Sequence, residues 1–419
     1  MRADTRIERA YRDDAPRILG AVARTTGDLL LAEEAVQEAF ARALAEAARG
    51  REPANPAAWI TTVARRVALD ALRRERTAVR AAPALAAEAA RDADVRHAAA
   101  RAAETTGGSE VFTGDERLQL ILLVAHPDLA PAARVALALR FVCGVPTGRI
   151  ADAFLVSEPT MAARLTRAKK RIHDSGIRFR LDDPGAVVER MPDALTTIHL
   201  LYSCAHTAVG DDARTDDRLR ADAIELARDA HRVAPGSESA GLLGLLLLTE
   251  ARQPTRFTVD GDFATLREAD RSRWDAALIA EGERYATVGL AGDGRFGLQA
   301  GIAGLHAIAP TWAATDWPAI VRLYDGLVRL WPSPAARLGR IVALGHSPDA
   351  GPEAALGELA ADPGLGGGAL AQQVHAARAE LLRLAGRPAD AAVELRLAVD
   401  TARDDRTERS LRRLLTALD

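Results

Sequence analysis

The sequence predicts an all-α protein in which two small helical domains are followed by a long array of helical hairpins. Strong helix formers, alanine above all, dominate the 419 residues, while aromatic residues make up only 4%. Runs of β-branched residues are short and scattered, so no segment is typical of a strand. Apolar residues instead recur every three or four positions between breaks formed by Pro and Gly.

Charge is divided unevenly along the chain. Residues 1–180 carry 29 Lys and Arg against 23 Asp and Glu, whereas the remainder carries 26 against 35. The basic first part suits a polyanionic partner, and the acidic second part does not.

Cysteine usage and hydropathy exclude several classes of protein. Cys143 and Cys204 stand in separate contexts without a CxxC spacing, so we expect neither a zinc site nor a disulfide framework. The first 20 residues carry charges throughout and show no targeting signal. The longest apolar run, Gly241 to Thr249, is too short to span a bilayer. We therefore expect a cytoplasmic protein that has no membrane partner.

The first domain is expected at residues 1–80, in three helices. The first helix covers residues 5–26 and ends at Gly27, and Asp28 can cap the second. That second helix has an apolar stripe on its inner side, and its outer face carries Glu33, Glu34, Gln37 and Glu38. After a loop that contains Asn55, the third helix has an apolar face, with Trp59 and Val63, and a polar face made of Arg65, Arg66, Arg73, Arg74 and Arg76.

The second domain is expected at residues 114–178, after a linker at residues 81–113. Its last part, Thr147 to Arg171, predicts two short helices joined by a turn, with Ser157 as the cap of the second helix. The apolar face of that helix is formed by Met161, Leu165, Ala168 and Ile172, and the other face is basic. A recognition helix in the major groove needs these two faces, but an ordinary hairpin with a solvated basic side shows the same pattern.

The remainder, residues 186–419, is expected to form a single array of helices that begins after a short bridge at residues 176–185. Residues 377–398 resemble a tetratricopeptide (TPR) unit, in which one helix ends at Gly and the next begins shortly after it. We therefore expect a TPR-like array with a concave groove. Its helices are expected near residues 187–208, 218–234, 238–252, 268–289, 295–309, 317–331, 335–345, 352–361, 369–386, 388–402 and 405–418.

Two ordered motifs in the first domain carry a resemblance to a known family. The segment from Glu33 to Phe40, EEAVQEAF, is followed by WI-x-x-VARR-x-A-x-D-x-LRR from Trp59 to Arg74. Together they resemble region 2 of the extracytoplasmic-function sigma factors of bacterial RNA polymerase, with Ala35 and Arg66 as mild departures. The helix-turn-helix then falls where region 4 of such a factor should be. Residues 126–169 resemble the subgroup with a long C-terminal helical extension.

The resemblance implies two partners, core RNA polymerase and promoter DNA, and no cofactor, metal or catalytic residue. It places region 4 against the β flap of the polymerase. It places five residues of the first domain against the β′ clamp: Glu33, Glu34, Gln37, Glu38 and Phe40. It places others at the −10 element: Arg65, Arg66, Arg73, Arg74 and, in the loop that holds a flipped-out base, Asn55. The −35 element would be recognised by Ser157, Glu158, Thr160, Ala163, Arg164, Arg167, Lys169, Lys170 and Arg171.

Other functions have to be weighed against this one. Asp270, Asp275 and Glu281 with His306 could form a hydrolytic or metal cluster, but no HExxH, GxSxG or P-loop accompanies them. The segment DRSRWD, residues 270–275, is more simply explained as a loop tied to helix ends by Arg–carboxylate bonds and anchored by Trp274. A TPR-type scaffold and a one-component helix-turn-helix regulator remain as alternatives.

The acidic extension is expected to modulate activity in cis and to offer a surface for a regulatory partner or ligand. Two of its positions depart from the pattern of the subgroup. Residues 204–207, CAHT, replace an Asn-Glu-Gly-Tyr-like stretch, and Gly339 stands where Asn is usual.

Overall fold

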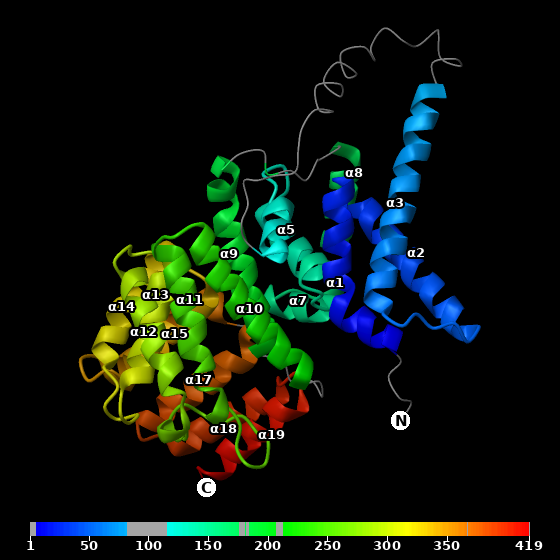
Figure 1. Ribbon diagram of the computed structural model, residues 1–419. Coiled ribbons are helices and arrows are strands. Elements are labelled where there is room, and N and C mark those ends of the chain that lie inside the picture. Colours follow the sequence, from blue (N-terminus) through cyan, green and yellow to red (C-terminus); the bar gives the residue numbers. More distant parts are fainter. Residues whose placement is uncertain are drawn as a thin grey trace. The chain divides into compact units, whose positions relative to one another are not determined.

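The computed structural model describes residues 6–81, 115–175, 181, 184–206, 213–366 and 368–418 (Figure 1). Nearly all of these residues lie in helices or short turns, and their β pairing is limited to one bridge between Phe257 and Phe263. The prediction of an all-α protein is therefore confirmed. Within these ranges no helix is long and apolar enough to cross a membrane. The expected linker and most of the expected bridge lie outside the described residues.

Two compact units divide the chain. The first contains residues 1–151 and 158–197, and the second contains residues 152–157 and 198–419. Helix α9 (Pro184–His206) contributes its first part to one unit and its last part to the other.

The first unit begins with three mutually packed helices, α1 (Arg6–Thr26), α2 (Leu29–Ala48) and α3 (Pro56–Ala81). Gly27 ends α1 in the left-handed region, with φ +67°, where glycine carries no Cβ penalty. The Asp28 side chain then accepts a hydrogen bond from the Leu31 amide at 3.0 Å and caps α2. These bounds agree closely with the predicted ones.

The helix-turn-helix follows, with all but residues 152–157 in the same unit. Its supporting helices are α5 (Glu116–Val124), α6 (Pro131–Leu137) and the π-helical turn η2 (Ala138–Val142). Helix α7 (Thr147–Ala153) and α8 (Glu158–Ser175) flank a turn in which Leu155 has φ +55°. The apolar face predicted for α8 is buried, at Met161, Leu165, Ala168 and Ile172. This burial fixes which side of α8 is left to solvent.

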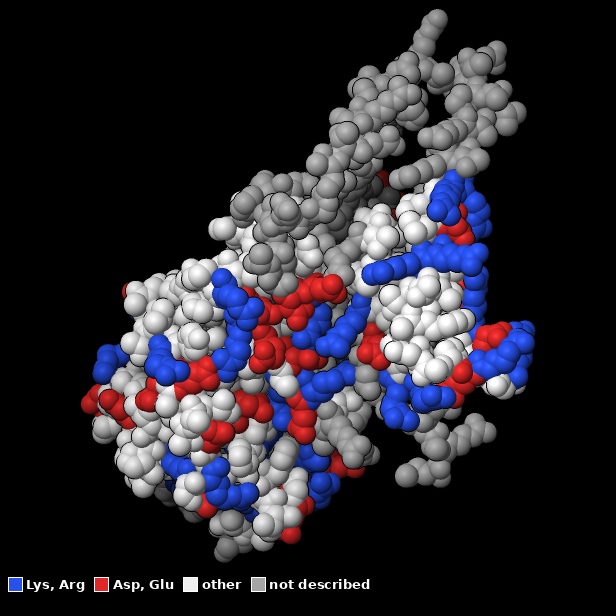
Figure 2. Space-filling view, viewed as in Figure 1, with Lys and Arg blue, Asp and Glu red and all other residues white. Residues whose placement is uncertain are grey.

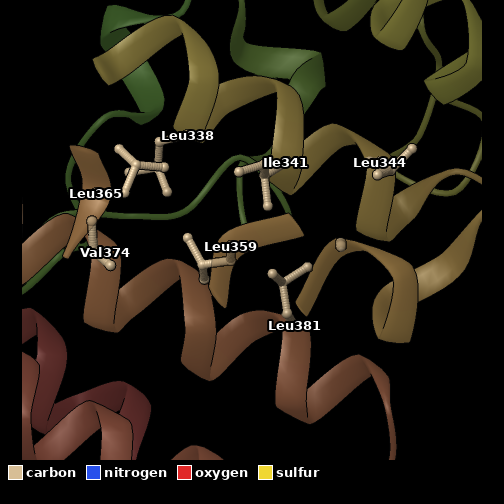
Figure 3. Close-up of a cluster of buried hydrophobic side chains, with 8 residues drawn as sticks. Leu338, Ile341, Leu344, Leu359, Leu365, Val374 and Leu381 are labelled. Carbon is tan, nitrogen blue, oxygen red and sulfur yellow. The ribbon is translucent and has the colours of Figure 1, made fainter. Parts of the chain in front are cut away.

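The second unit is a succession of helices, each packed on its neighbours in the chain (Figure 1). Their bounds are α10 (Ala213–Val233), α11 (Ser237–Glu250), α12 (Ala276–Leu290), α13 (Arg295–Ile308), α14 (Trp317–Leu330), α15 (Pro334–His346), α16 (Gly351–Ala361), α17 (Ala371–Leu384), α18 (Pro388–Asp400) and α19 (Asp405–Thr416). Figure 3 shows one of its apolar clusters, where Leu338, Ile341 and Leu344 of α15 face Leu359 of α16 and Leu381 of α17. Whether the array follows the TPR pattern stays a prediction.

Three helices of the second unit meet at glycines. A Cβ on Gly241 of α11 would lie 2.4 Å from the Gly297 nitrogen of α13. A Cβ on Gly289 of α12 would lie 2.6 Å from the Gly241 Cα, and one on Gly297 would lie 2.2 Å from the Gly289 oxygen. The backbones of α11, α12 and α13 therefore approach so closely that only glycine fits at these three positions.

One predicted helix, at residues 268–289, is wrong at its start. Helix α12 begins only at Ala276, because Asp275 caps it with hydrogen bonds of 2.9 and 3.0 Å from the Ala277 and Leu278 amides. Before it lies the 3₁₀ turn η4 (Arg271–Arg273), which Asp270 caps in the same way. The local hydrogen bonds of these two aspartates compete with a continuous helix.

The loop at residues 270–275 is tied down differently from the expectation. Arg271 donates to the His306 and Ala309 carbonyls, both at 2.6 Å, at the end of α13, rather than to carboxylates. Trp274 is buried, as predicted, and its Nε1 donates to the Thr255 hydroxyl at 2.7 Å. The loop is therefore fixed by helix caps, carbonyls and one indole.

Candidate nucleic-acid interface

The solvent side of α8 carries most of the residues predicted to contact the −35 element. Arg164 and Lys169 are half-buried, and the other seven are exposed: Ser157, Glu158, Thr160, Ala163, Arg167, Lys170 and Arg171. Because the opposite face is packed in the core, these side chains cannot turn inward without unfolding the domain. The small Thr160 and Ala163 near the start of the helix would let a duplex approach closely, and the basic residues follow toward its end.

Lys169 is engaged inside the first unit. Its Nζ donates to both carboxylate oxygens of Glu33, at 2.7 and 2.9 Å, and lies 4.4 Å from the centroid of the Phe141 ring. Glu33 belongs to the face of α2 that was predicted to meet the polymerase. A residue predicted to contact DNA and a residue predicted to contact polymerase are thus bonded to each other, although 136 positions separate them.

Four arginines of the basic face predicted for α3 are exposed, namely Arg65, Arg66, Arg73 and Arg74, and Figure 2 shows basic side chains gathered along this helix. Arg65 and Arg66 form no hydrogen bond or ion pair with another residue in the described ranges. Arg73 pairs with Asp70 at 3.1 Å, and Arg74 Nε donates to the Asp70 carbonyl at 3.3 Å. All four guanidinium groups can therefore reach an external polyanion at little cost in internal contacts.

The loop before α3 is held in place by its own polar contacts. Glu46 accepts hydrogen bonds from Arg51 at 2.8 Å and from Arg49 at 2.9 Å, and these arginines lower the pKa of its carboxyl. The Asn55 Oδ1 accepts from the Ala58 amide at 3.2 Å and caps α3. Asn55 is exposed, and this cap uses only the oxygen of its side-chain amide.

The outer face of α2 differs from the prediction at one residue. Glu34, Gln37 and Glu38 are exposed, and Glu33 is half-buried beneath Lys169. Phe40 is only 5% exposed, and its ring packs edge-on against Tyr11 of α1, with ring centroids 5.1 Å apart. The prediction that Phe40 faces the polymerase is therefore corrected: it is a core residue that fixes α2 on α1.

The residues that suggested an enzyme do not form one cluster. Asp270 and Asp275 cap helices, and Glu281 is bonded to Arg228 of α10, which lowers the pKa of the Glu281 carboxyl. The His306 ring stacks on Trp312 at a centroid distance of 6.2 Å and meets Trp317 edge-on at 5.3 Å, and burial lowers its pKa to about 4. In the described part of the chain, no three His, Cys, Asp or Glu side chains are grouped so that they could hold a metal.

Family comparisons divide the chain in agreement with this geometry. Residues 10–78 match the model described as Sigma-70 region 2, and residues 119–172 match Sigma-70, region 4. Residues 190–288 match a family of unknown function (DUF6596). The first two matches contain nearly all of α3 and of α8, and the third lies in the C-terminal extension.

Relatives with curated sequences extend over both parts. An uncharacterized protein of Rhizobium meliloti is 36% identical over 353 residues, which cover 84% of this chain and 81% of that protein. A probable ECF RNA polymerase sigma factor SigI of Mycobacterium tuberculosis is 27% identical over 204 residues, which cover 48% of this chain and 63% of that protein. No solved structure matches the chain. The motifs, the buried and basic faces of α8 and the two sigma-70 matches together show that the chain belongs to the extracytoplasmic-function sigma factors of bacterial RNA polymerase and carries a long helical C-terminal extension.

Proposed function

We propose that the chain binds core RNA polymerase through the acidic face of α2 and directs it to promoters that α3 and α8 recognise. In this proposal residues 1–80 bind the β′ clamp and the −10 element, and residues 114–178 bind the −35 element and the β flap. The observation that carries it is the division of α8, which buries Met161 and Leu165 and exposes Arg167, Lys170 and Arg171 within the region 4 match.

The two DNA-binding surfaces are expected to be weak when they act alone. Each offers only a few basic side chains, and binding strength in the absence of base contacts scales with the number of phosphates neutralised. Tethering both surfaces to one polymerase raises their effective concentration on the promoter. Sequence-specific binding should therefore appear only in the complex with polymerase, which separates this function from that of a one-component regulator.

The pair between Glu33 and Lys169 has to open for both proposed contacts to form. Glu33 cannot offer its carboxylate to the clamp, and Lys169 cannot offer its ammonium group to DNA, while the two are bonded at 2.7 Å. We infer that binding of polymerase exchanges this internal ion pair for external ones.

Reconstituted transcription tests the proposal. The chain is mixed with core RNA polymerase and a promoter library, and stoichiometric complex formation and specific initiation are measured. Arg171→Ala should weaken initiation that depends on the −35 element and leave polymerase binding intact, because its exposed side chain lies at the end of the basic face of α8. Arg396→Ala, an exposed arginine of α18, is the matched control. Equal loss of polymerase binding in Arg171→Ala contradicts the assignment of α8.

The C-terminal extension is proposed to modulate this activity, and the contacts of α9 decide where the chain should be cut to test it. A cut after Phe179 removes Asp193, whose carboxylate accepts a 2.6 Å hydrogen bond from Arg134 of α6 within the first unit. A chain that ends at Thr197 keeps that bond. Promoter-directed transcription by residues 1–197 should differ from that of the whole chain, and equal activity under all conditions tested would contradict a modulating role.

A further inference from the structure

A cavity of about 290 Å³ lies in the second unit. Its wall combines the end of α9, the end of α11 and the loop that leads toward α12, and it contains Arg252, Gln253 and Arg256 together with His206, Phe263 and Leu266. The volume is at the lower end of the range of about 300–1,000 Å³ that is typical of small-molecule sites. The cavity is therefore large enough for a metabolite and too small for a folded partner.

Two arginines give the cavity its charge. Neither the Arg252 nor the Arg256 guanidinium forms a hydrogen bond or ion pair with a residue in the described ranges. Arg256 instead lies over two aromatic rings, 5.4 Å from the centroid of Phe257 and 5.2 Å from that of Phe263. Such stacking holds the plane of the guanidinium in place and leaves its N–H groups available to an oxyanion.

Three nearby carboxylates within the described ranges are already bound elsewhere. Glu250 accepts hydrogen bonds from Tyr202 at 2.8 Å and from Arg220 at 3.1 Å. Glu268 is paired with Arg413 and Asp262 with Arg409, and both of these arginines come from α19. The positive charge of Arg252 and Arg256 is thus not balanced by these three groups.

Burial makes this charge costly. It lowers the pKa of Arg252, and it lowers the pKa of Arg256 to about 10, to which the neighbouring Arg220, Arg406 and Arg252 contribute. Burial also lowers the pKa of His206 to about 2, so its ring is neutral, and its Nδ1 accepts a 2.8 Å hydrogen bond from the Gln253 amide. A half-buried cation that has no counter-charge among the described residues is unfavourable, and a bound anion would offset that cost.

We propose that this cavity binds a small organic anion whose carboxylate or phosphate group pairs with Arg252 and Arg256 and whose apolar part lies against Phe263 and Leu266. This site goes beyond the promoter function proposed above and does not depend on it, since binding is measured without polymerase or DNA.

Calorimetry and thermal unfolding of the whole chain test the site with four probes: benzoate, phenyl phosphate, inorganic phosphate and benzyl alcohol. Phenyl phosphate or benzoate should bind with one-to-one stoichiometry and raise the unfolding temperature, whereas uncharged benzyl alcohol should not. Comparison of the two acids shows which oxyanion the arginines prefer, and inorganic phosphate shows what the apolar wall contributes. Arg252→Gln and Arg256→Gln should each weaken binding by about tenfold or more, as loss of a charge-assisted hydrogen bond does.

Arg396→Gln is the matched control, because it removes one exposed guanidinium from the same unit, away from the cavity wall. It should leave binding unchanged. Three results would overturn the proposal: no anion binds at about 10 mM, where a site with a millimolar Kd would be mostly occupied; benzyl alcohol binds as well as the acids; or Arg396→Gln weakens binding as much as the two cavity variants. The comparison between acid and alcohol uses the unaltered chain, so it holds even if a variant does not fold.

Discussion

Replacement of Lys169 by Gln should increase the affinity of the free chain for core RNA polymerase. The substitution removes the ion pair with Glu33 and the contact with the Phe141 ring, while every proposed polymerase contact on α2 is kept. The side chains of the pair are 33% and 22% exposed, so the pair is partly screened by water. Exposed pairs contribute up to about 1 kcal/mol, and a cation–π contact contributes roughly 0.5–1 kcal/mol.

A total of about 1 kcal/mol corresponds to a roughly fivefold change in an equilibrium constant. If polymerase binds only the open arrangement, the apparent Kd falls as the open fraction rises. Fluorescence anisotropy of the labelled chain, titrated with core polymerase in the absence of DNA, should therefore show roughly fivefold tighter binding for Lys169→Gln. The gain should shrink at high salt, where the original pair is weaker.

Lys170→Gln is the matched control, since it removes the same charge one position later, from an exposed side chain that has no ion pair with a described residue. Its affinity for polymerase should equal that of the unaltered chain. If Lys169→Gln behaves like Lys170→Gln, the pair does not limit polymerase binding. If Lys169→Gln binds more weakly, the closed arrangement itself supports binding, and the reasoning from the pair is wrong.

Three further outcomes are expected from the described contacts. Gly241→Ala should lower the free energy of unfolding of the second unit by about 1–3 kcal/mol in urea denaturation, since a Cβ would meet the α13 backbone. The control Gly357→Ala on α16, where a Cβ meets open space, should instead raise that free energy by about 0.5–1 kcal/mol. Asp193→Ala should lower the free energy of unfolding of the first unit by about 1–3 kcal/mol, because Arg134 loses its charged partner. The loss is measured as a lower unfolding temperature, and an unchanged temperature would show that the pair contributes nothing. His206 has a pKa of about 2 in the folded chain and takes up its proton near pH 6.5 when unfolded, so stability should fall as the pH drops from 6.5. His206→Gln should therefore reduce the slope of the unfolding free energy against pH, between pH 6 and 4, by the equivalent of about one proton.

Helix positions were predictable because they depend on local rules. The 3.6-residue periodicity, together with Pro and Gly at the breaks, fixed most helix ends to within a few residues of those observed. The start of α12 was missed because Asp270 and Asp275 use their side chains to cap a 3₁₀ turn and a later helix start. A window that scores helix propensity does not register such competing hydrogen bonds.

The candidate site was predictable only where one helix face decides it. The exposed basic side of α8 followed from its apolar stripe, whereas Phe40 lies at the edge of the stripe on α2 and could be placed on either side. Its ring packs against Tyr11, which comes from another helix. The cavity residues Arg252 and Arg256 gave no signal at all, because two arginines after the end of a helix normally suggest solvated charge.

The bond between Glu33 and Lys169 shows why a helix face does not by itself reveal a partner. Both residues lie on the polar sides of their helices, and each pattern correctly predicts a charge that needs a counter-charge. A pattern cannot tell whether the counter-charge of Glu33 belongs to polymerase or to this chain, or whether that of Lys169 belongs to DNA or to this chain. In the free chain one residue of each predicted surface, Glu33 and Lys169, satisfies the other. A charged face that binds another molecule can therefore also stabilise the unbound state, and this internal competition sets how strongly the partner must bind.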